Sequence, residues 1–312
     1  MGDARGTRHL VLLHGMGATG EVWLPWAPLL ERHWPGRWLA PDLAGHGWSP
    51  PLPPRAATGG AALASGDADG VAAVPGVAAA SGGADGVATA LGVAAASGDA
   101  DEVAAAPGAV DEGATVTGYS FAALAQRVVD GFGAVRLGPN DRLVLLGHSL
   151  GGVVALALAA RRRGLPVDAV VGLGIKVAWS PAELAKAEEL AARPVTWFAT
   201  RDEAARRYLR VSGLAGLFAP DHPVVDAGLR RGDGRWRLAM DPAAFAVGAP
   251  RLPALLAAVD VPVLLARGER DPMVTDAQLK ELGVPVATLP GLGHNAHVED
   301  PAAVLALLDP YL

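Results

Sequence analysis

The chain has 312 residues and a formal net charge of −6 at pH 7, and 51% of its residues are hydrophobic. A chain of this length can bury a large core, either as one domain or as a core with an excursion. The negative charge and the lack of a long basic run argue against nucleic acid as a partner. Cysteine is absent, which excludes disulfides and cysteine nucleophiles and agrees with the cytoplasmic location that we expect.

The first apolar segment predicts a strand over residues 9–13. It is much too short to span a membrane, and no stretch resembles a signal peptide, so we expect no membrane partner. The strand leads into residues 14–20, whose G-x-G-x-x-G spacing matches a dinucleotide-binding fingerprint, with Asp42 at a suitable distance. A nucleotide-binding site would give no role to His14 or to the motif at 147–151, so we keep nucleotide binding only as an alternative.

The next segments predict a helix over residues 23–33 and a strand over residues 37–40. The loop that follows, residues 41–49, contains Asp42 and His46, which could be read as catalytic. We expect them to be structural instead. In that interpretation Asp42 accepts hydrogen bonds from backbone N–H groups, and the glycines on either side of His46 supply unusual dihedral angles.

Residues 56–114 differ in composition from the rest of the chain. Three similar segments begin 16 residues apart, at Ser65, Ser81 and Ser97, and no aromatic residue occurs in this stretch. Its Asp-x-Asp-Gly fragments lack the terminal Glu of an EF-hand loop, and the period does not fit a nine-residue β-helix repeat. With so few bulky side chains to bury, the segment is expected to be disordered or weakly helical.

A strand, a G-x-S-x-G motif and a helix follow one another in the centre of the chain. A helix with Ser120 as its N-cap precedes them. Leu143–Leu146 predicts a strand buried on both faces, residues 147–151 read Gly-His-Ser-Leu-Gly, and Val153–Arg163 predicts a helix. A serine in so sharp a turn has a strained backbone, and its hydroxyl is exposed at the positive end of the helix. The close approach of strand and helix leaves room only for glycine at both ends of the motif.

This arrangement resembles the nucleophile elbow of the α/β-hydrolases, with Ser149 as the nucleophile. The resemblance implies an α/β fold with a mostly parallel central sheet, helices on both faces and a helical cap. The core would comprise residues 1–55, 115–175 and 251–312, interrupted by the insertion at 56–114 and by the cap at 176–250. In the family the backbone N–H groups at positions corresponding to Met16 and Leu150 form the oxyanion hole.

The expected cap contains predicted helices over residues 181–193 and 200–210. Most of the aromatic residues outside the N-terminal segment lie in it. They either shape an apolar substrate pocket or form the core of the cap, and the sequence does not decide between the two. Lys176, at the expected end of the strand predicted over 169–175, could bind a substrate carboxylate or be solvated. The aromatic residues considered are Trp179, Trp197, Phe198, Tyr208, Phe218 and Trp236.

The partners of Ser149 are expected after later strands, because in this fold the chain order is nucleophile, acid, histidine. Asp271 follows a strand beginning at Val261, and His294 follows a strand over 284–289. Glu269 is the rival acid and His297 the rival base. Two further expectations complete the chain: His148 packs or bonds locally, and Asp300 caps a closing helix over 302–308.

The resemblance implies a serine hydrolase that cleaves a small or medium carboxylic ester or lactone through an acyl-enzyme, without a metal or cofactor. The substrate is expected to be a small molecule with an apolar acyl group. A C–C bond hydrolase, a cofactor-free perhydrolase and a catalytically silent binding protein are the alternatives. The sequence leaves the oligomeric state open.

Overall fold

The computed structural model describes residues 7–53, 79–80, 118–132, 137–161 and 165–312. Its centre is a seven-stranded sheet with the strand order β3-β2-β1-β4-β5-β8-β9, in which only β3 is antiparallel to its neighbour. This confirms the mostly parallel sheet. The strands are β1 (Arg8–Leu13), β2 (Arg37–Leu39), β3 (Ala79–Ala80), β4 (Arg142–His148), β5 (Val167–Leu173), β8 (Val263–Gly268) and β9 (Val286–Leu289).

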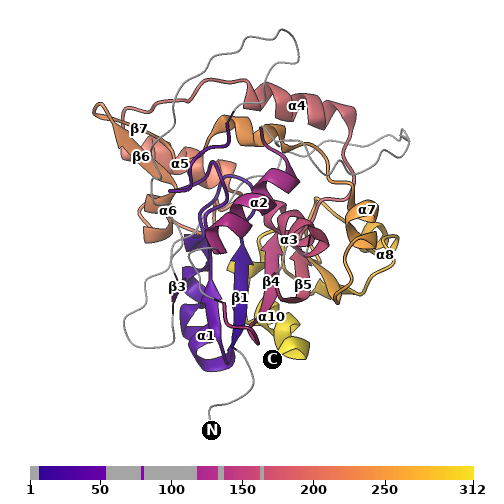
Figure 1. The fold of residues 1–312 in the computed structure, drawn as a ribbon. Helices are drawn as coiled ribbons and strands as arrows, with labels where there is room; N and C mark the ends of the chain where they lie inside the picture. Colours follow the sequence, from indigo (N-terminus) through magenta and orange to yellow (C-terminus); the bar gives the residue numbers. More distant parts are fainter. Residues whose placement is uncertain (1–6, 54–78, 81–117, 133–136, 162–164) are drawn as a thin grey trace, which may run out of the picture.

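Helices cover both faces of the sheet, and each face has its own hydrophobic cluster (Figure 1). Because successive side chains of a strand point to opposite faces, Leu10 and Leu12 belong to one cluster and Val11 and Leu13 to the other. The first cluster includes residues of η1 (Glu21–Trp26), α1 (Ala27–His33), α10 (Pro301–Leu305) and η3 (Ala306–Tyr311). The second includes residues of α2 (Phe121–Phe132), α3 (Leu150–Arg161), α7 (Leu252–Ala257) and α8 (Asp276–Lys280).

The predicted beginning of the first helix, over 23–33, is wrong. The segment starts as a 3₁₀ helix at Glu21 and becomes the α-helix α1 only at Ala27. Pro25 lies inside the 3₁₀ segment and has no amide hydrogen to donate to the α-helical ladder. Trp26 and Leu30 are each at most 1% exposed, so one side of the segment is buried in the core.

Both predicted helix caps are confirmed. The Ser120 Oγ accepts a hydrogen bond from the Ala123 amide at 3.1 Å, at the start of α2. The Asp300 carboxylate accepts one from the Ala303 amide at 3.0 Å, at the start of α10. The closing segment is an α-helix for one turn only and then continues as the 3₁₀ helix η3.

A small second layer lies over the carboxyl ends of the strands, at the top of Figure 1. It comprises α4 (Pro181–Ala191), α5 (Arg201–Val211), α6 (Pro223–Ala227), the hairpin β6 (Leu229–Gly232) and β7 (Arg235–Leu238), and η2 (Pro242–Val247). The expected cap helices are present, α5 with the capping Thr200. The hairpin was not predicted. β6 (Leu-Arg-Arg-Gly) lacks the alternation of apolar and polar residues that indicates a strand, and β7 (Arg-Trp-Arg-Leu) shows it over only four residues.

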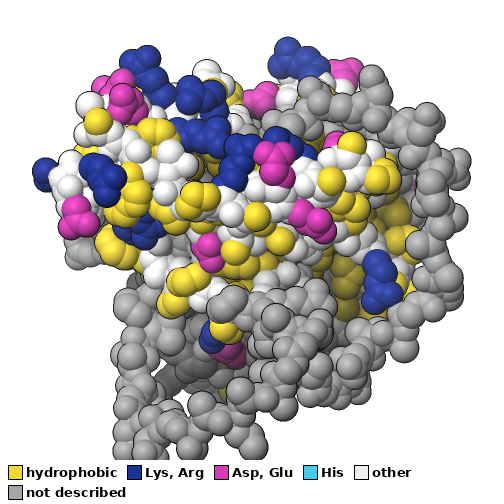
Figure 2. Space-filling view, turned by 90° about the horizontal axis from the view of Figure 1, so that it is seen from above, with side chains coloured by type: hydrophobic (Ala, Val, Ile, Leu, Met, Phe, Trp, Pro, Cys, Tyr) yellow, Lys and Arg dark blue, Asp and Glu magenta, His cyan; other side chains and the backbone are white. Residues whose placement is uncertain are grey.

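The surface of this layer carries many basic side chains, as the view from above shows (Figure 2). Several arginines of the hairpin lie over tryptophan rings: Arg230 is 3.6 Å from the ring centroid of Trp48 and Arg235 is 5.3 Å from that of Trp197. Trp48 belongs to the loop after β2, so the first of these contacts joins the hairpin to the core.

The expectation for residues 56–114 falls outside the described residues, except for Ala79 and Ala80. These two residues form β3, which pairs antiparallel with β2. The flanks of the insertion are close together, because the Gly118 amide donates a hydrogen bond to the Pro53 carbonyl at 2.9 Å. No helix in the described parts of the chain has the length and apolar character needed to cross a membrane.

Candidate active site

Ser149 lies in the sharp turn between β4 and α3. Its φ of +50° is in the left-handed region, which among the other described non-glycine residues only Asp233 adopts. A Cβ on Gly147 would lie 2.2 Å from the Gly151 carbonyl oxygen, and one on Gly151 would lie 2.3 Å from the Leu13 carbonyl oxygen. Both glycines of the motif are therefore required by close backbone contacts, as the sequence predicts.

Ser149 is more exposed than its neighbours along the chain. Every residue from Leu143 to Ala159 is buried except Ser149, which is partly exposed. It immediately precedes the 12-residue helix α3, whose N-terminal end carries a partial positive charge. The partly exposed Ser149 thus lies beside the positive end of a helix.

The two expected oxyanion donors lie on either side of this turn. Met16 belongs to the loop after β1, and Leu150 is the first residue of α3. Among the residues that the structure describes, nothing accepts a hydrogen bond from either backbone N–H. The loop also lies against the elbow, since a Cβ on Gly15 would come 3.3 Å from the Ser149 Cβ. Two unused donors close to a serine are what an oxyanion hole requires.

Asp271 and His294 are brought together although 23 residues separate them. The His294 Nδ1 is 2.9 Å from the Asp271 Oδ2. The acid side chain is fully buried, while the imidazole is 10% exposed. A carboxylate can only accept, so Nδ1 carries the proton and Nε2 is the basic nitrogen. The other carboxylate oxygen of Asp271 accepts a hydrogen bond from the Met273 amide at 2.8 Å.

Strand β5 connects this pair to Ser149. The Ser149 amide donates to the Leu173 carbonyl at 2.8 Å. The next residue, Gly174, has a φ of +62°, and a Cβ there would lie 3.2 Å from the His294 ring and 3.3 Å from the Asp271 carboxylate. Sequence reasoning did not single out Gly174. Its only signal is a glycine at the end of a buried strand, which is too common to indicate a site.

Arg267, at the end of β8, was also missed and organises the turn that carries Asp271. It is 8% exposed and donates to the carbonyls of Glu269 at 2.8 Å and Asp271 at 3.1 Å. It also forms an ion pair with Asp276 at 2.7 Å. A buried guanidinium with several donors can hold the backbone of such a turn in one shape.

The rival acid and base have other contacts. Glu269 accepts a hydrogen bond from the Gly291 amide at 2.7 Å. His297 is 1% exposed, and its ring centroid is 4.6 Å from that of Trp23. Burial lowers the pKa of His297 to about 3, so it stays neutral inside the core. Neither residue lies against Asp271 as His294 does.

The His148 ring is packed, as expected, but its hydrogen bond is not local. Its Nε2 is 2.9 Å from the backbone oxygen of His294, 146 residues away. Its ring centroid is 4.7 Å from that of His294 and 4.2 Å from that of His297. The residue before the nucleophile therefore contacts the loop that carries the candidate base. The parallel sheet causes this contact, because it brings the ends of β4 and β9 to the same edge.

The loop at 41–49 is structural, as expected. The Asp42 carboxylate accepts hydrogen bonds from the amides of Gly20 at 3.2 Å and Trp48 at 2.9 Å. Burial raises the pKa of Asp42 to about 7. His46 is buried, with Nδ1 3.1 Å from the Ala44 carbonyl. Asp42 is thus committed to backbone amides, which removes the acidic partner that the dinucleotide alternative would need for a ribose.

His14 has a structural task as well. It is fully buried and has a partner for each ring nitrogen, the Gly15 carbonyl at 2.7 Å and the Leu43 amide at 2.9 Å. These contacts join the loop after β1 to the loop after β2. The position of Met16 is therefore supported by a neutral imidazole, whose pKa is held well below its usual value by burial.

The cap residues do not have the contacts that would make them the substrate site. Lys176 forms an ion pair with Glu183 of α4 and lies 5.0 Å from the ring centroid of Trp179, so it is neither solvated nor free for a substrate carboxylate. The structure favours the cap-core alternative for most of the aromatic set. The members that pack in or against the hydrophobic core are Phe198, Tyr208, Phe218 and Trp236.

A different apolar cluster borders the candidate oxyanion loop. Val211, Met240 and Ala244 of the cap are buried together, and the side chain of Met16 packs against them. Tyr119, Leu238 and Phe245 surround this cluster. Met16, the candidate oxyanion donor, thus has an apolar environment supplied by the cap.

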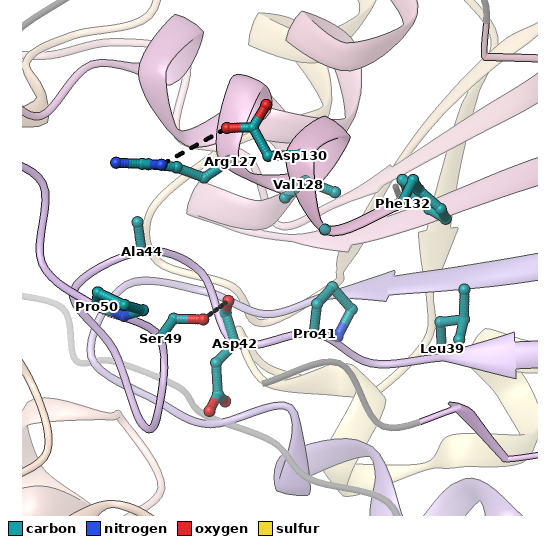
Figure 3. Close-up of a pocket in the computed structure, with 11 residues that line it drawn as sticks. Leu39, Pro41, Asp42, Ala44, Ser49, Pro50, Arg127, Val128, Asp130 and Phe132 are labelled. Atoms are coloured by element: carbon teal, nitrogen blue, oxygen red, sulfur yellow. Dashed lines mark hydrogen bonds and ion pairs between the residues drawn. The ribbon is translucent and has the colours of Figure 1, made fainter. Parts of the chain in front are cut away.

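A cavity of about 130 Å³ lies elsewhere, between α2 and the loop after β2 (Figure 3). On one wall Arg127 and Asp130 form an ion pair at 3.7 Å, and on the other the Ser49 hydroxyl donates to the Asp42 carbonyl at 2.7 Å. Neither Ser149 nor His294 lines it. Within the described residues, no group of three or more His, Asp or Glu side chains is placed to hold a metal ion.

No curated protein matches the chain in sequence. Its fold is similar to that of E-2-(acetamidomethylene)succinate hydrolase, with 18% identity, a TM-score of 0.61 and coverage of 98% of this chain and 92% of that chain. It is also similar to the thioesterase domain from the curacin biosynthetic pathway, with 18% identity, a TM-score of 0.60 and coverage of 97% and 91%. It is similar as well to an esterase of M. tuberculosis, with 20% identity, a TM-score of 0.60 and coverage of 98% of this chain and 85% of that chain.

At these identities the structural similarities concern the fold. The sequence itself matches the family described as alpha/beta hydrolase fold over residues 8–301. This range contains the elbow, the oxyanion loop and both residues of the Asp271–His294 pair. The chain therefore belongs to the α/β-hydrolase family.

Proposed function

We propose that the protein is a serine hydrolase that cleaves a carboxylic ester or lactone with Ser149, His294 and Asp271 as its triad. The observation that carries this proposal is the hydrogen bond between His294 and Asp271, formed beside the strained turn that presents Ser149. Serine needs an imidazole to accept its proton, and the imidazole needs a carboxylate to fix its tautomer. A bond from Nδ1 to Asp271 leaves Nε2 of His294 to accept the serine proton.

The reaction would proceed in two stages. The Ser149 hydroxyl attacks the substrate carbonyl while His294 Nε2 takes its proton, and the resulting oxyanion accepts hydrogen bonds from the Met16 and Leu150 amides. The intermediate collapses, the leaving alcohol receives the proton from His294, and an acyl-enzyme remains. Water then attacks the acyl group while His294 takes a proton from it. When this second intermediate collapses, the bond to the Ser149 Oγ breaks, His294 returns the proton to Oγ, and the acid is released. For a lactone the alcohol stays attached to the acyl chain.

The oxyanion donors are expected to make a large contribution to the rate. A donor aimed at charge that develops only in the transition state is worth roughly 2.7–4 kcal/mol. The unused state of both amides supports this role, because neither would have to give up a protein partner. A main-chain donor cannot be removed by truncating a side chain, so these two groups are best tested by the structure of an adduct.

The substrate is proposed to carry an apolar acyl group of small or medium size. The support is the apolar cluster of Val211, Met240 and Ala244 beside Met16. A serine at position 149 does not fit an epoxide hydrolase or haloalkane dehalogenase, relatives that have aspartate at this position. A C–C bond hydrolase and a cofactor-free perhydrolase would use the same three residues, so they are separated from an esterase by substrate rather than by site.

A fluorophosphonate probe tests the proposal, because it reacts covalently with an activated serine. Wild type should be labelled and the variant Ser149→Ala should not. A series of p-nitrophenyl esters of graded chain length should then give turnover that is lost in the same variant, with preference for the chain length that fits the cluster at Met16. A folded wild-type protein that is neither labelled nor active would favour the silent binding protein.

A further inference from the structure

The side chain of His148 lies between two loops of the candidate site. Its Nε2 is 2.9 Å from the His294 backbone oxygen, and its ring is 4.7 Å from the His294 ring between centroids. On another side, a Cβ on Gly15 would come 2.9 Å from its Nδ1, so the ring lies against the oxyanion loop. His148 is 1% exposed. One buried ring thus touches the loop of the candidate base and the loop of a candidate oxyanion donor.

The hydrogen bond fixes the protonation state of this ring. A carbonyl oxygen can only accept, so Nε2 of His148 carries the proton and Nδ1 does not. Burial, and the nearby imidazoles of His297 and His294, hold the pKa of His148 well below its usual value. The ring is therefore neutral near pH 7, and its Nε2–H donates to the His294 carbonyl.

The loop that carries His294 is held by side chains from several elements. Two of its backbone amides are bound by carboxylates, and the carbonyl of His294 itself is bound by His148. Only the last bond comes from the turn that holds the nucleophile, because His148 is the residue before Ser149. The three bonds are Gly291 to Glu269 at 2.7 Å, Gly293 to Glu299 at 2.8 Å, and His148 to His294 at 2.9 Å.

We propose that His148 is a positioning residue, which sets the place of the His294 imidazole relative to Ser149 through its hydrogen bond to the His294 carbonyl. This inference rests on the proposed function, since it assigns a role in that reaction. The bond gives nucleophile and base a common support that does not pass through the rest of the sheet. A misplacement of about 1 Å in reacting groups can lower a rate by about 100-fold, so a bond of this kind affects turnover more than binding.

The test compares two amide side chains of different length. In His148→Gln the amide nitrogen reaches about as far as Nε2 and can still donate to the His294 carbonyl. In His148→Asn it reaches only about as far as Nδ1. We expect His148→Asn to lower kcat by about 10- to 100-fold with KM within about twofold of wild type, and His148→Gln to recover kcat to within about fivefold. The rate of fluorophosphonate labelling should change in parallel with kcat.

The control is His9→Asn. His9 is also 1% exposed and forms one hydrogen bond, to Asp141 at 2.9 Å, at the opposite end of the sheet. The His9→Asn variant should have a lower free energy of unfolding than wild type, while kcat of the folded protein stays unchanged. If His148→Asn does not fold, His148→Leu, which fills the space without a donor, takes its place in the comparison with His148→Gln.

The outcomes separate this inference from the proposed function. Wild type that is labelled at Ser149, together with a donor-free His148 variant as active as wild type, would overturn the positioning role alone. The same holds if the glutamine variant is no more active than the donor-free one. Wild type that is neither labelled nor active would overturn the proposed function and the positioning role with it.

Discussion

Replacing Gly174 by alanine should impair the reaction more than it impairs the fold. The backbone at this position has a φ of +62°, where an L-residue is strained by about 1–2 kcal/mol. The new Cβ would also lie 3.2 Å from the His294 ring, close enough that the ring must move by a few tenths of an ångström. If a shift of 1 Å lowers a rate by about 100-fold, a shift of this size lowers kcat by about 4- to 10-fold.

The matched control is Gly283→Ala. Gly283 has a φ of +72° and nothing within 4 Å of an added Cβ, so it carries the same backbone strain without a neighbour in the site. Both variants should lose about 1–2 kcal/mol of unfolding free energy in denaturant titrations. Only Gly174→Ala should lower kcat for a p-nitrophenyl ester. Equal kcat values for the two variants would refute the claim that Gly174 sets the position of His294.

Three other outcomes are expected. Asp271→Asn should lower kcat by about 10⁴-fold, because the amide no longer fixes the tautomer of His294, while Glu269→Gln should stay near wild type; the reverse order would make Glu269 the acid. Burial lowers the pKa of His297 from 6.5 to about 3. Below about pH 6.5 the unfolded chain therefore binds more protons than the folded protein, and the free energy of unfolding falls as the pH falls. His297→Phe should therefore remove about 2 kcal/mol of the loss in unfolding free energy between pH 7 and pH 5, and an unchanged loss would contradict its neutral burial. Replacing residues 56–114 by a short Gly-Ser linker should leave ester cleavage intact and the melting temperature within about 4 °C; a folded but inactive protein would show that the insertion contributes to the site.

The parts of the fold that the sequence predicts are those with a local cause. A run of four apolar residues followed by G-x-S-x-G predicts strand β4, the elbow and helix α3, because the turn requires glycines at both ends. The helix caps at Ser120 and Asp300 are likewise decided by the residues next to them. The hairpin β6–β7 was missed because its strands have only four residues each and depend on pairing with one another. The 3₁₀ start before Ala27 is an exception, because Pro25 is a local signal for it that was not used.

The candidate site shows the same division. The pairing of Asp271 with His294 follows from chain order and strand ends, and the structure contains it. The contacts of His148 and Gly174 join segments that no sequence spacing relates. Arg267 contacts carbonyls only two and four residues away, but no recognised motif marks an arginine at this position. For Lys176 the sequence suggested a substrate carboxylate or solvent as its partner, but the partner is Glu183, only seven residues away. The start of α4 brings Glu183 to Lys176.

The most direct test of the account is a crystal structure of the protein after reaction with a fluorophosphonate. It should contain a covalent bond from the Ser149 Oγ to phosphorus, with one phosphonyl oxygen about 2.7–3.1 Å from both the Met16 and Leu150 amide nitrogens. The His294 Nε2 should lie within about 3.2 Å of the Ser149 Oγ or of the position that the leaving group occupied. Its Nδ1 should still be bound to Asp271. An adduct on another residue, or an adduct on Ser149 with His294 turned away from it, would contradict the proposed triad.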